Sequence, residues 1–238
     1  FAARIIRSMR QNLIIQGGIF HEFSETSNAL IKLLDSLGFK SIVFDEVEEG
    51  LEQLTYQNYS LLTINALRWE MDGEKYDPYR EEWAMRLSKS AKDAIISHLE
   101  KGGAILGIHT ASICFSDWEE WPKILGGSWE WGASWHPNPE KISLIPTKHE
   151  LAVNNAFAVT DELYTNLNVC DESSILLEGS CSSSLDPQPV LWVNEYRSGR
   201  VIYDSLGHTA ESILHTEHAS WLKSTVEWAT NISKDLSR

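Results

Sequence analysis

The sequence has 238 residues, of which 42% are hydrophobic and 23% are charged, so it can bury a core and shows no sign of disorder. Its net charge of −14 argues against a nucleic-acid partner, because phosphate neutralisation needs clustered Lys and Arg. The charge also argues weakly against anionic membranes and polyanionic substrates. A small neutral ligand such as a sugar is compatible with this charge, although the charge can equally well do no more than keep the protein soluble.

The three cysteines, Cys114, Cys170 and Cys181, are too sparse and too widely spaced for a disulfide framework or a structural zinc site. No apolar run approaches the roughly 20 residues that span a bilayer, and no signal peptide is visible. We therefore expect a cytoplasmic protein without a membrane partner, and a homo-oligomer is left open. The first residue is Phe1 rather than Met, so we expect residues 1–11 to be a disordered or non-native start.

Strand-like and helix-like segments alternate along the first half of the chain, which is typical of βαβ units around a parallel sheet. Short apolar runs predict four strands there, over Asn12–Gln16, Ser41–Phe44, Ser60–Ile64 and Ala104–Ile108. Leucines at helical spacing predict a helix over Thr26–Leu37, which Gly38 ends.

A further helix is predicted to begin at Asp77-Pro78, because a capping side chain precedes a proline at the first helical position. Its buried stripe recurs about every four residues and ends before Gly102-Gly103. The stripe consists of Trp83, Leu87, Ala91, Ile95 and Leu99. His98 lies beside this stripe, and we expect it to face solvent.

The second half of the chain carries shorter strand patterns, some of which predict an antiparallel extension. These candidates are Ile142–Ile145, Ile175–Leu177, Val190–Val193 and Val201–Tyr203, and Trp221–Ala229 is a closing helix. The whole pattern predicts a single α/β domain over residues 1–238, with a flavodoxin-like, doubly wound and mostly parallel sheet. Ligands of such sheets bind outside the carboxyl ends of the strands.

Histidines follow several of these strands. His21 follows the first strand across Gly17-Gly18, His109 comes directly after Ala104–Ile108, and His208 lies just beyond Val201–Tyr203. Asn65 and Trp69 follow the strand that begins at Ser60. We therefore expect three of the eight histidines to meet at one edge of the sheet.

The segment Gly107-Ile108-His109-Thr110-Ala111 has small residues around a reactive side chain at a strand end. A sharp turn from strand to helix needs such small neighbours and holds the central side chain out over the sheet edge. The N-terminus of the following helix would offer free N–H groups to a developing oxyanion. The segment resembles the nucleophile elbow of class I glutamine amidotransferase-like proteins, with His109 in place of their cysteine. A glutaminase is excluded, because no thioester can form there.

With this replacement, the sequence resembles the ThuA-like (trehalose utilisation) family over about residues 12–230. The matching blocks occur in the family's order and spacing. They are GIHTA at 107–111, DWEEWPKILGG at 117–127 with Trp135-His136-Pro137 beyond it, DELY at 161–164, and PVLWVNEYRSGRVIYDSLGH at 189–208. The family is linked to the catabolism of trehalose and related disaccharides, and acts on the sugars or their 3-keto derivatives.

The resemblance implies a carbohydrate pocket lined by histidines and one glutamate. Its implied catalytic residues are His109, His208 and Glu162. Its candidates for substrate binding are His21, His136 and His149. Tyr164, Trp192 and Arg200 are further candidates for substrate binding, although the resemblance itself does not imply them. Tyr164 and Trp192 more often belong to a core, and Arg200 more often to a hairpin turn.

Two departures from the family pattern concern the histidines. His149 is followed by Glu150 where the family often has proline. Glu211 lies three residues beyond His208, rather than the two that are usual for a triad carboxylate.

Three functions remain open at this level. The first is a sugar-modifying enzyme, an isomerase, lyase or hydrolase, in which histidines and Glu162 transfer protons, since the ordinary pKa of His is about 6.5. The second is a non-catalytic sugar-binding module. The third is a metal-dependent hydrolase, because clustered neutral imidazoles and a carboxylate can hold zinc. No H-E-x-x-H spacing supports it, so no cofactor and no metal ligand is assigned, and a divalent metal remains an alternative.

Overall fold

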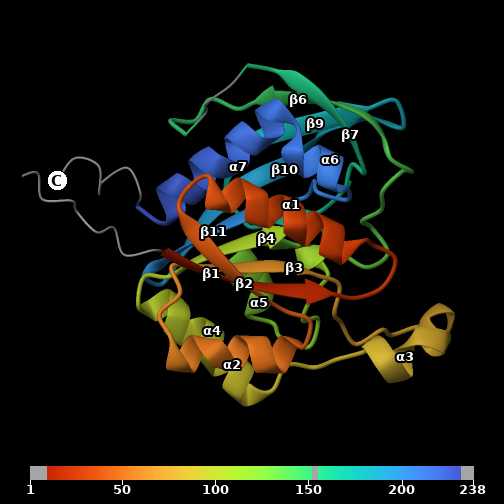
Figure 1. The fold of residues 1–238 in the computed structure, drawn as a ribbon. Coiled ribbons are helices and arrows are strands. Elements are labelled where there is room, and N and C mark those ends of the chain that lie inside the picture. The colour runs from red at the N-terminus through yellow and green to blue at the C-terminus, as the bar shows by residue number, and fades with distance from the viewer. Residues whose placement is uncertain (1–9, 152–154, 232–238) are drawn as a thin grey trace, which may run out of the picture.

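The computed structural model describes residues 10–151 and 155–231, which form a nine-stranded mixed sheet with helices on both faces (Figure 1). The strand order is β2-β1-β3-β4-β11-β10-β9-β6-β7. The parallel half consists of β1 (Arg10–Gly17), β2 (Phe39–Phe44), β3 (Leu61–Ala66), β4 (Ala104–Ile108) and β11 (Gly199–Asp204). The predicted α/β fold, in which a parallel sheet carries an antiparallel extension, is therefore confirmed as a mixed sheet whose N-terminal half is mostly parallel.

The antiparallel extension pairs with the last strand of the parallel half. It consists of β10 (Ser184–Tyr196), β9 (Ser174–Cys181), β6 (Glu140–Pro146) and β7 (Phe157–Asp161). A separate two-stranded ladder joins β5 (Gly127–Ser128) to β8 (Asn168–Val169). Strands β3 and β4 are buried along their whole length, which explains why β4 is an apolar run without alternation.

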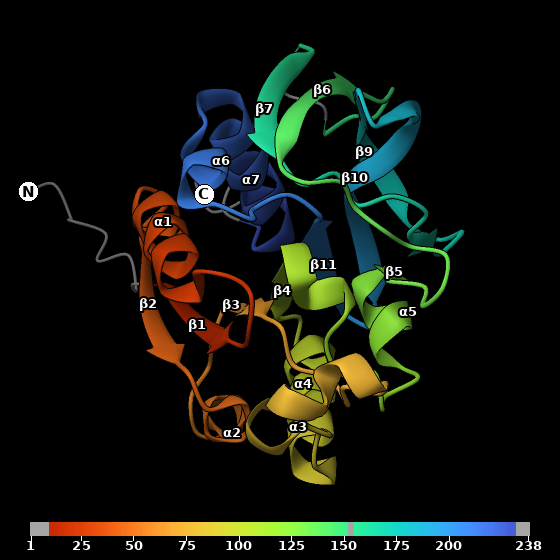
Figure 2. The same ribbon diagram turned by 90° about the vertical axis from the view of Figure 1, so that its right-hand side faces the viewer.

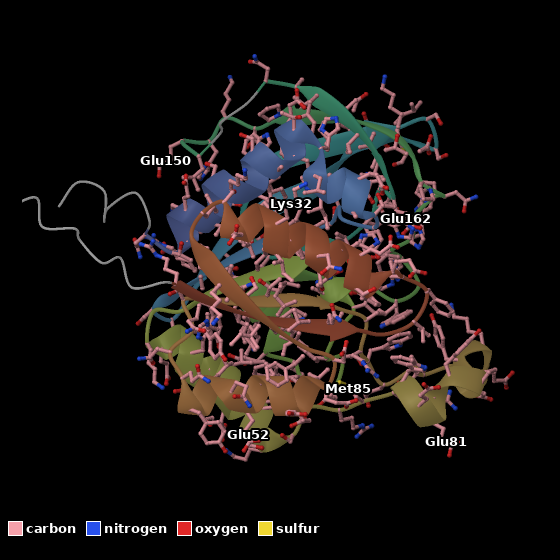
Figure 3. All side chains as sticks on the ribbon, viewed as in Figure 1. Lys32, Glu52, Glu81, Met85, Glu150 and Glu162 are labelled. Carbon is pink, nitrogen blue, oxygen red and sulfur yellow. The ribbon has the colours of Figure 1, made fainter. Side chains whose placement is uncertain are left out.

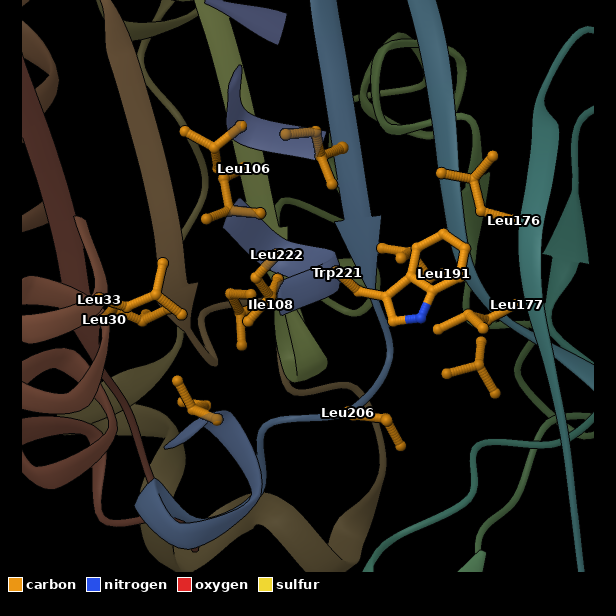
Figure 4. Packing of buried hydrophobic residues seen from close by; sticks show 14 of the residues in the cluster. Leu30, Leu33, Leu106, Ile108, Leu176, Leu177, Leu191, Leu206, Trp221 and Leu222 are labelled. Atoms are coloured by element: carbon orange, nitrogen blue, oxygen red, sulfur yellow. The ribbon is translucent and has the colours of Figure 1, made fainter. Parts of the chain in front are cut away.

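Two layers of helices cover the sheet (Figure 1). One face carries α1 (Phe23–Asp35), α6 (Ala210–Leu214) and α7 (Thr216–Ala229). The other carries α2 (Val47–Tyr56), α4 (Lys89–Glu100) and α5 (Trp121–Leu125), while α3 (Asp77–Trp83) projects away from the body. Figure 4 shows the first of the two cores, where Trp221 and Leu222 of α7 pack near Ile108 of β4 and Leu191 of β10.

The helix predicted to run from Asp77 to Leu99 is two helices, and the prediction of one continuous helix is wrong. The backbone becomes extended at Ala84, and Ser88 begins α4 by accepting a hydrogen bond from the N–H of Ala91 at 3.1 Å. The expected solvent exposure of His98 is also wrong. Its ring is buried over Gly103, and its Nε2 hydrogen-bonds with the carbonyl of Ala104 at 2.9 Å.

The expected disordered start overlaps β1 at residues 10 and 11. These two residues pair with Phe39 and Lys40 of β2, so the expected disorder is wrong for them, and residues 1–9 lie outside the described residues. Helix α2 and strand β7 are two elements that the sequence patterns did not predict. Within the described part of the chain, no helix has the length and apolar character needed to cross a membrane.

Candidate functional site

The carboxyl ends of the parallel strands gather three imidazoles. In Figure 1 the arrows of β1 and β2 point to the right, so Figure 2 looks onto the edge where these strands end. The ring of His21 lies 5.1 Å from that of His109 and 4.9 Å from that of His208, and the rings of His109 and His208 are 5.4 Å apart, between centroids. The predicted meeting of these histidines at one edge of the sheet is confirmed.

His109 sits on a strained turn directly after β4, with a φ of +49°. Such a left-handed backbone costs free energy in a residue with a Cβ and occurs mostly where the surroundings enforce it. Here the Tyr203 hydroxyl donates to the carbonyl of His109 at 2.7 Å. The imidazole Nδ1–H donates to the carbonyl of Ser205 at 2.7 Å, which fixes the ring and directs Nε2 into the site.

The turn after His109 differs from the expected helix. It is a single 3₁₀ turn, η2 (His109–Ser112), and the next helix, α5, begins only at Trp121. The expected oxyanion site at a helix N-terminus is therefore wrong, because one short turn has neither aligned free N–H groups nor a helix dipole. The nearest donor is instead the Tyr164 hydroxyl, 3.2 Å from His109 Nε2. Burial raises the pKa of this phenol well above its ordinary value, so it stays protonated.

Glycine brings His21 back over the sheet edge. Gly18 has a φ of +141°, and a Cβ on it would lie 2.5 Å from the carbonyl oxygen of Leu67. Only glycine fits this close approach of two backbones. His21 Nδ1–H then donates to the carbonyl of Ile19 at 3.2 Å, and His21 Nε2 is buried without a hydrogen-bond partner.

Asp161 joins the end of β7 to the loop that follows β11. Its carboxylate is fully buried and accepts hydrogen bonds from three backbone N–H groups: Glu162 at 2.7 Å, Gly207 at 2.8 Å and His208 at 3.2 Å. Asp161 thus has a structural role at this turn. Strand β7 lies at the edge of the sheet farthest from β2, but the hydrogen bonds of Asp161 to Gly207 and His208 bring Glu162 beside His208.

Glu162 lies at the centre of the site, with only 7% of its surface exposed. Its Oε2 is 3.4 Å from His109 Nε2, 3.3 Å from His136 Nδ1 and 3.5 Å from His208 Nδ1. We call these four residues, Glu162, His109, His136 and His208, the Glu162 cluster. One carboxylate oxygen therefore faces imidazoles from three separate segments of the chain.

Burial and charge set the protonation of these groups. Burial alone would lower the pKa of His109, but its close contact with the Glu162 carboxylate and the nearby negative charge outweigh burial and raise that pKa. Burial would raise the pKa of Glu162, but the contact with His109 and the positive charge of the protonated ring lower it. Burial, assisted by the charge of His109, lowers the pKa of His21 to about 4, and burial also lowers that of His208. Near pH 7 the site therefore holds a carboxylate beside neutral His21 and His208.

An aromatic pocket of about 360 Å³ opens above the cluster. Its floor includes Glu162 and His208, and its walls are mostly rings. The wall rings belong to Phe20, Trp69, Tyr76, Trp129, Trp131 and Tyr164. Trp69 stacks with Trp131 at 6.4 Å between centroids, and 49% of Trp131 remains exposed at the mouth. A polar floor under aromatic walls suits a ligand that has hydroxyl groups and flat apolar faces.

Most of the residues predicted from the sequence meet here. The structure brings together His21, His109, His136, Glu162, Tyr164 and His208. Their catalytic and binding roles stay predictions.

Three predicted substrate contacts do not reach the pocket, so the predictions for them are wrong. Trp192 is fully buried in the core, where its Nε1–H donates to the carbonyl of Leu125 at 2.9 Å. Arg200 lies at the start of β11, while the site lies beyond its end, and it donates to the carbonyl of Trp228 at 2.7 Å.

The third of these residues, His149, lines a separate hollow with its neighbour Glu150. Its Nδ1 accepts a hydrogen bond from the N–H of Leu151 at 3.2 Å. Figure 3 shows Glu150 and Glu162 on opposite sides of the molecule. The resemblance to the family thus did not predict the position of His149 correctly, and this is a site where the next residue, Glu150, differs from the family pattern.

Most of the aromatic wall escaped sequence reasoning. Phe20, Tyr76, Trp129 and Trp131 come from loops whose paths no periodic pattern predicts. The high content of ten tryptophans was the available signal, together with the position of Trp69 after β3.

The fold and the site together define an α/β protein with a histidine on the turn directly after β4. The chain belongs to the trehalose utilisation (ThuA) family, whose model matches residues 12–229. None of the curated protein sequences compared with this chain matches it.

Solved structures support the same fold. A ThuA-like protein from Parabacteroides merdae ATCC 43184 has a TM-score of 0.73 and 16% identity, over 93% of this chain and 90% of that one. A ThuA-like protein from Bacteroides uniformis ATCC 8492 has a TM-score of 0.69 and 17% identity, over 96% of this chain and 95% of that one. A cytoplasmic protein from Salmonella typhimurium LT2 has a TM-score of 0.63 and 12% identity, over 92% of this chain and 99% of that one. At these identities the likeness shows the fold alone.

Proposed function

We propose that this protein is a cytoplasmic enzyme that acts on a small carbohydrate, a trehalose-related disaccharide or its 3-keto derivative. The observation that carries the proposal is the position of Glu162 Oε2. This atom is buried at the floor of an aromatic pocket and lies within 3.5 Å of three imidazole nitrogens. Carboxylates and imidazoles are the side chains that most often transfer protons in enzymes, and a merely structural role does not need so many of them.

The chemistry suited to this arrangement is proton transfer beside a carbonyl group. The C–H bond next to the keto group of a 3-keto sugar is acidic. Glu162 takes that proton, the C–H electron pair forms the carbon–carbon double bond of an enediol, and the carbonyl oxygen accepts a proton from a donor. Tyr164 and His109 supply donor groups on the same wall. Return of the proton to the neighbouring carbon gives an isomer, and loss of a leaving group gives elimination.

The pocket walls fit the same ligand class. A volume of about 360 Å³ lies within the range of roughly 300–1,000 Å³ typical of small-molecule sites. Exposed Trp131 and the neighbouring Trp69 offer broad faces to the apolar side of a sugar ring. The polar atoms of the floor then face the hydroxyl and carbonyl groups.

The test combines turnover with binding. Purified protein is incubated with trehalose, 3-ketotrehalose and 3-ketosucrose in D₂O, and ¹H NMR follows loss of the C–H signal and formation of product. We expect turnover of at least one sugar, and we expect Glu162→Gln to lower kcat by about 10²–10⁴-fold. His149→Ala is the matched control and leaves turnover unchanged, because His149 lies outside the pocket.

Two results contradict the proposal. Unchanged sugars in every incubation remove the enzymatic function. Calorimetric binding of a sugar that survives in His109→Ala, without turnover by the parent protein, identifies a sugar-binding module instead.

A further inference from the structure

Four donor atoms from separate segments converge in the site, and three of them have no hydrogen-bond partner. The unpartnered atoms are His21 Nε2, His208 Nδ1 and Glu162 Oε2. The fourth is His109 Nε2, and one donor atom from each residue lies within 4.8 Å of the others. Burying polar atoms without partners costs free energy, so such a set indicates a missing positive ligand. We propose that His21, His109, Glu162 and His208 bind one divalent transition-metal ion of the Zn²⁺ type.

The distances between these donors suit one small ion. Ligand atoms about 2.1 Å from a tetrahedral Zn²⁺ lie about 3.4 Å from one another. Glu162 Oε2 is 3.4 Å from His109 Nε2 and 3.5 Å from His208 Nδ1. The distances from the carboxylate oxygen to two imidazole nitrogens therefore already match those between ligands of one ion. Because all four donor atoms lie within 4.8 Å of one another, the side chains need to move inward only slightly to bind it.

The far side of two imidazoles is arranged as in metal sites. A metal-bound histidine usually donates its other ring N–H to a carbonyl or carboxylate, which fixes the tautomer and the ring. His109 Nδ1–H donates to the carbonyl of Ser205 at 2.7 Å, and His21 Nδ1–H donates to that of Ile19 at 3.2 Å. Metal binding requires both rings to be neutral, and in that form Nε2 of each ring carries a lone pair directed at the other donor atoms.

The donor types select the class of ion. Three imidazoles and one carboxylate suit zinc and its first-row neighbours, whereas Mg²⁺ and Ca²⁺ prefer oxygen ligands. The charge also favours a cation, because a doubly positive ion more than offsets the negative charge of Glu162, which is only 7% exposed.

His136 stands apart from this set. Its Nδ1 is near both Glu162 and the carbonyl of Pro137, and 39% of its side chain is exposed. His136 is therefore the imidazole that remains free to exchange protons with a substrate when the other three bind the ion.

The ion can bind whether or not the proposed function is correct. Only a catalytic role of the ion rests on the proposed function. With the ion bound, Glu162 is a ligand instead of the base, so the nearby His136 would take the substrate proton. The positive charge at the pocket floor would polarise a sugar carbonyl in place of the His109 donor. The experiment therefore measures metal binding without sugar and turnover separately.

The full-length protein is stripped with EDTA, dialysed, and titrated with ZnCl₂ by calorimetry. We expect one Zn²⁺ per chain, a higher Tm with Zn²⁺, and visible absorption from Co²⁺ in the same site. Glu162→Gln, His208→Ala and His21→Ala should each lower Zn²⁺ affinity at least about 100-fold. His149→Ala is the matched control and keeps the parent affinity. Circular dichroism without metal confirms that each variant is folded. His21 lies in a loop outside the helices and strands and is only half-buried, which makes that variant the safest.

Three results overturn the metal site. They are the absence of saturable Zn²⁺ binding to the parent, equal affinities in His208→Ala and His149→Ala, and equally strong binding of MgCl₂. Sugar turnover that is as fast in the stripped protein as in the Zn²⁺-loaded one removes the catalytic part alone. Zn²⁺ binding without any turnover supports the site and contradicts the proposed function.

Discussion

A buried ion pair between β11 and α7 holds the loop that carries His208. Asp204 Oδ2 is 2.7 Å from His218 Nε2, and each side chain is only 1% exposed. The other ring nitrogen of His218 donates to the carbonyl of Ser212 at 2.7 Å, so the protonated ring has both N–H groups satisfied. Asp204 Oδ1 also accepts from the N–H of Leu206 at 3.0 Å. We predict that His218→Leu destabilises the protein strongly, because it leaves the carboxylate of Asp204 buried without its partner.

The size of the effect follows from the burial of the pair. Removing one partner of a buried ion pair costs about 3–5 kcal/mol. An unfolding entropy of roughly 2.1 cal/mol/K per residue gives about 0.5 kcal/mol/K for 238 residues. Dividing the first quantity by the second predicts a fall in Tm of about 6–10 °C.

The cost also depends on pH, with a definite sign. Burial lowers the pKa of His218, but the charge and hydrogen bond of Asp204 outweigh burial and raise that pKa above 6.5. The stability contributed by the protonated ring is therefore fully present below the unfolded pKa, and it is lost as pH rises through the raised folded pKa. The free-energy cost of His218→Leu should be larger at pH 6 than at pH 9.

Urea unfolding followed by circular dichroism at the two pH values checks this prediction. Asp204→Asn and the double variant complete a cycle, from which we expect a coupling above about 1 kcal/mol. A cost below about 1 kcal/mol, or one that is the same at both pH values, would refute the reasoning.

Two further predictions concern the pocket. Gly18→Ala should cost about 2 kcal/mol or more and weaken Zn²⁺ binding, because the new Cβ would lie 2.5 Å from a backbone oxygen. Gly38→Ala, with φ +83° but open space around it, should cost less, and equal Tm values for the two would contradict the steric argument. Trp131→Ala should change stability by no more than about 0.5 kcal/mol, because Trp131 is 49% exposed, yet raise the sugar Kd about tenfold. Calorimetry with exposed Trp135→Ala as control checks this, and identical Kd values would remove Trp131 from the binding wall.

The parallel half of the fold and its histidines were predictable because the relevant information is local. Buried parallel strands are apolar runs separated by helices, and their carboxyl ends must share an edge. His21, His109 and His208 follow directly from that geometry. The sequence patterns could not show the break at Ala84, because the apolar spacing continues through it while the backbone becomes extended.

The direction in which a side chain points was harder to predict than the strand or loop in which the residue lies. Trp192 lies in a strand that matches the family pattern, but only the packed sheet decides that its ring faces the core beside Tyr203, at 4.4 Å between centroids. His149 and Arg200 likewise match in order along the chain but lie away from the site in space.

The amino-acid sequence by itself determined the family, the class of fold, and three imidazoles at one edge of the sheet, since these depend on strand order and on residues beside strand ends. The family resemblance implied a place for Glu162 in the pocket, but only the tertiary structure showed how it reaches these imidazoles. Its strand is at the far edge of the sheet, and the link is the set of hydrogen bonds from Asp161 to the backbone of Gly207 and His208. Contacts between residues so distant in sequence depend on how the sheet curves and how the loops pack, and no local pattern records them.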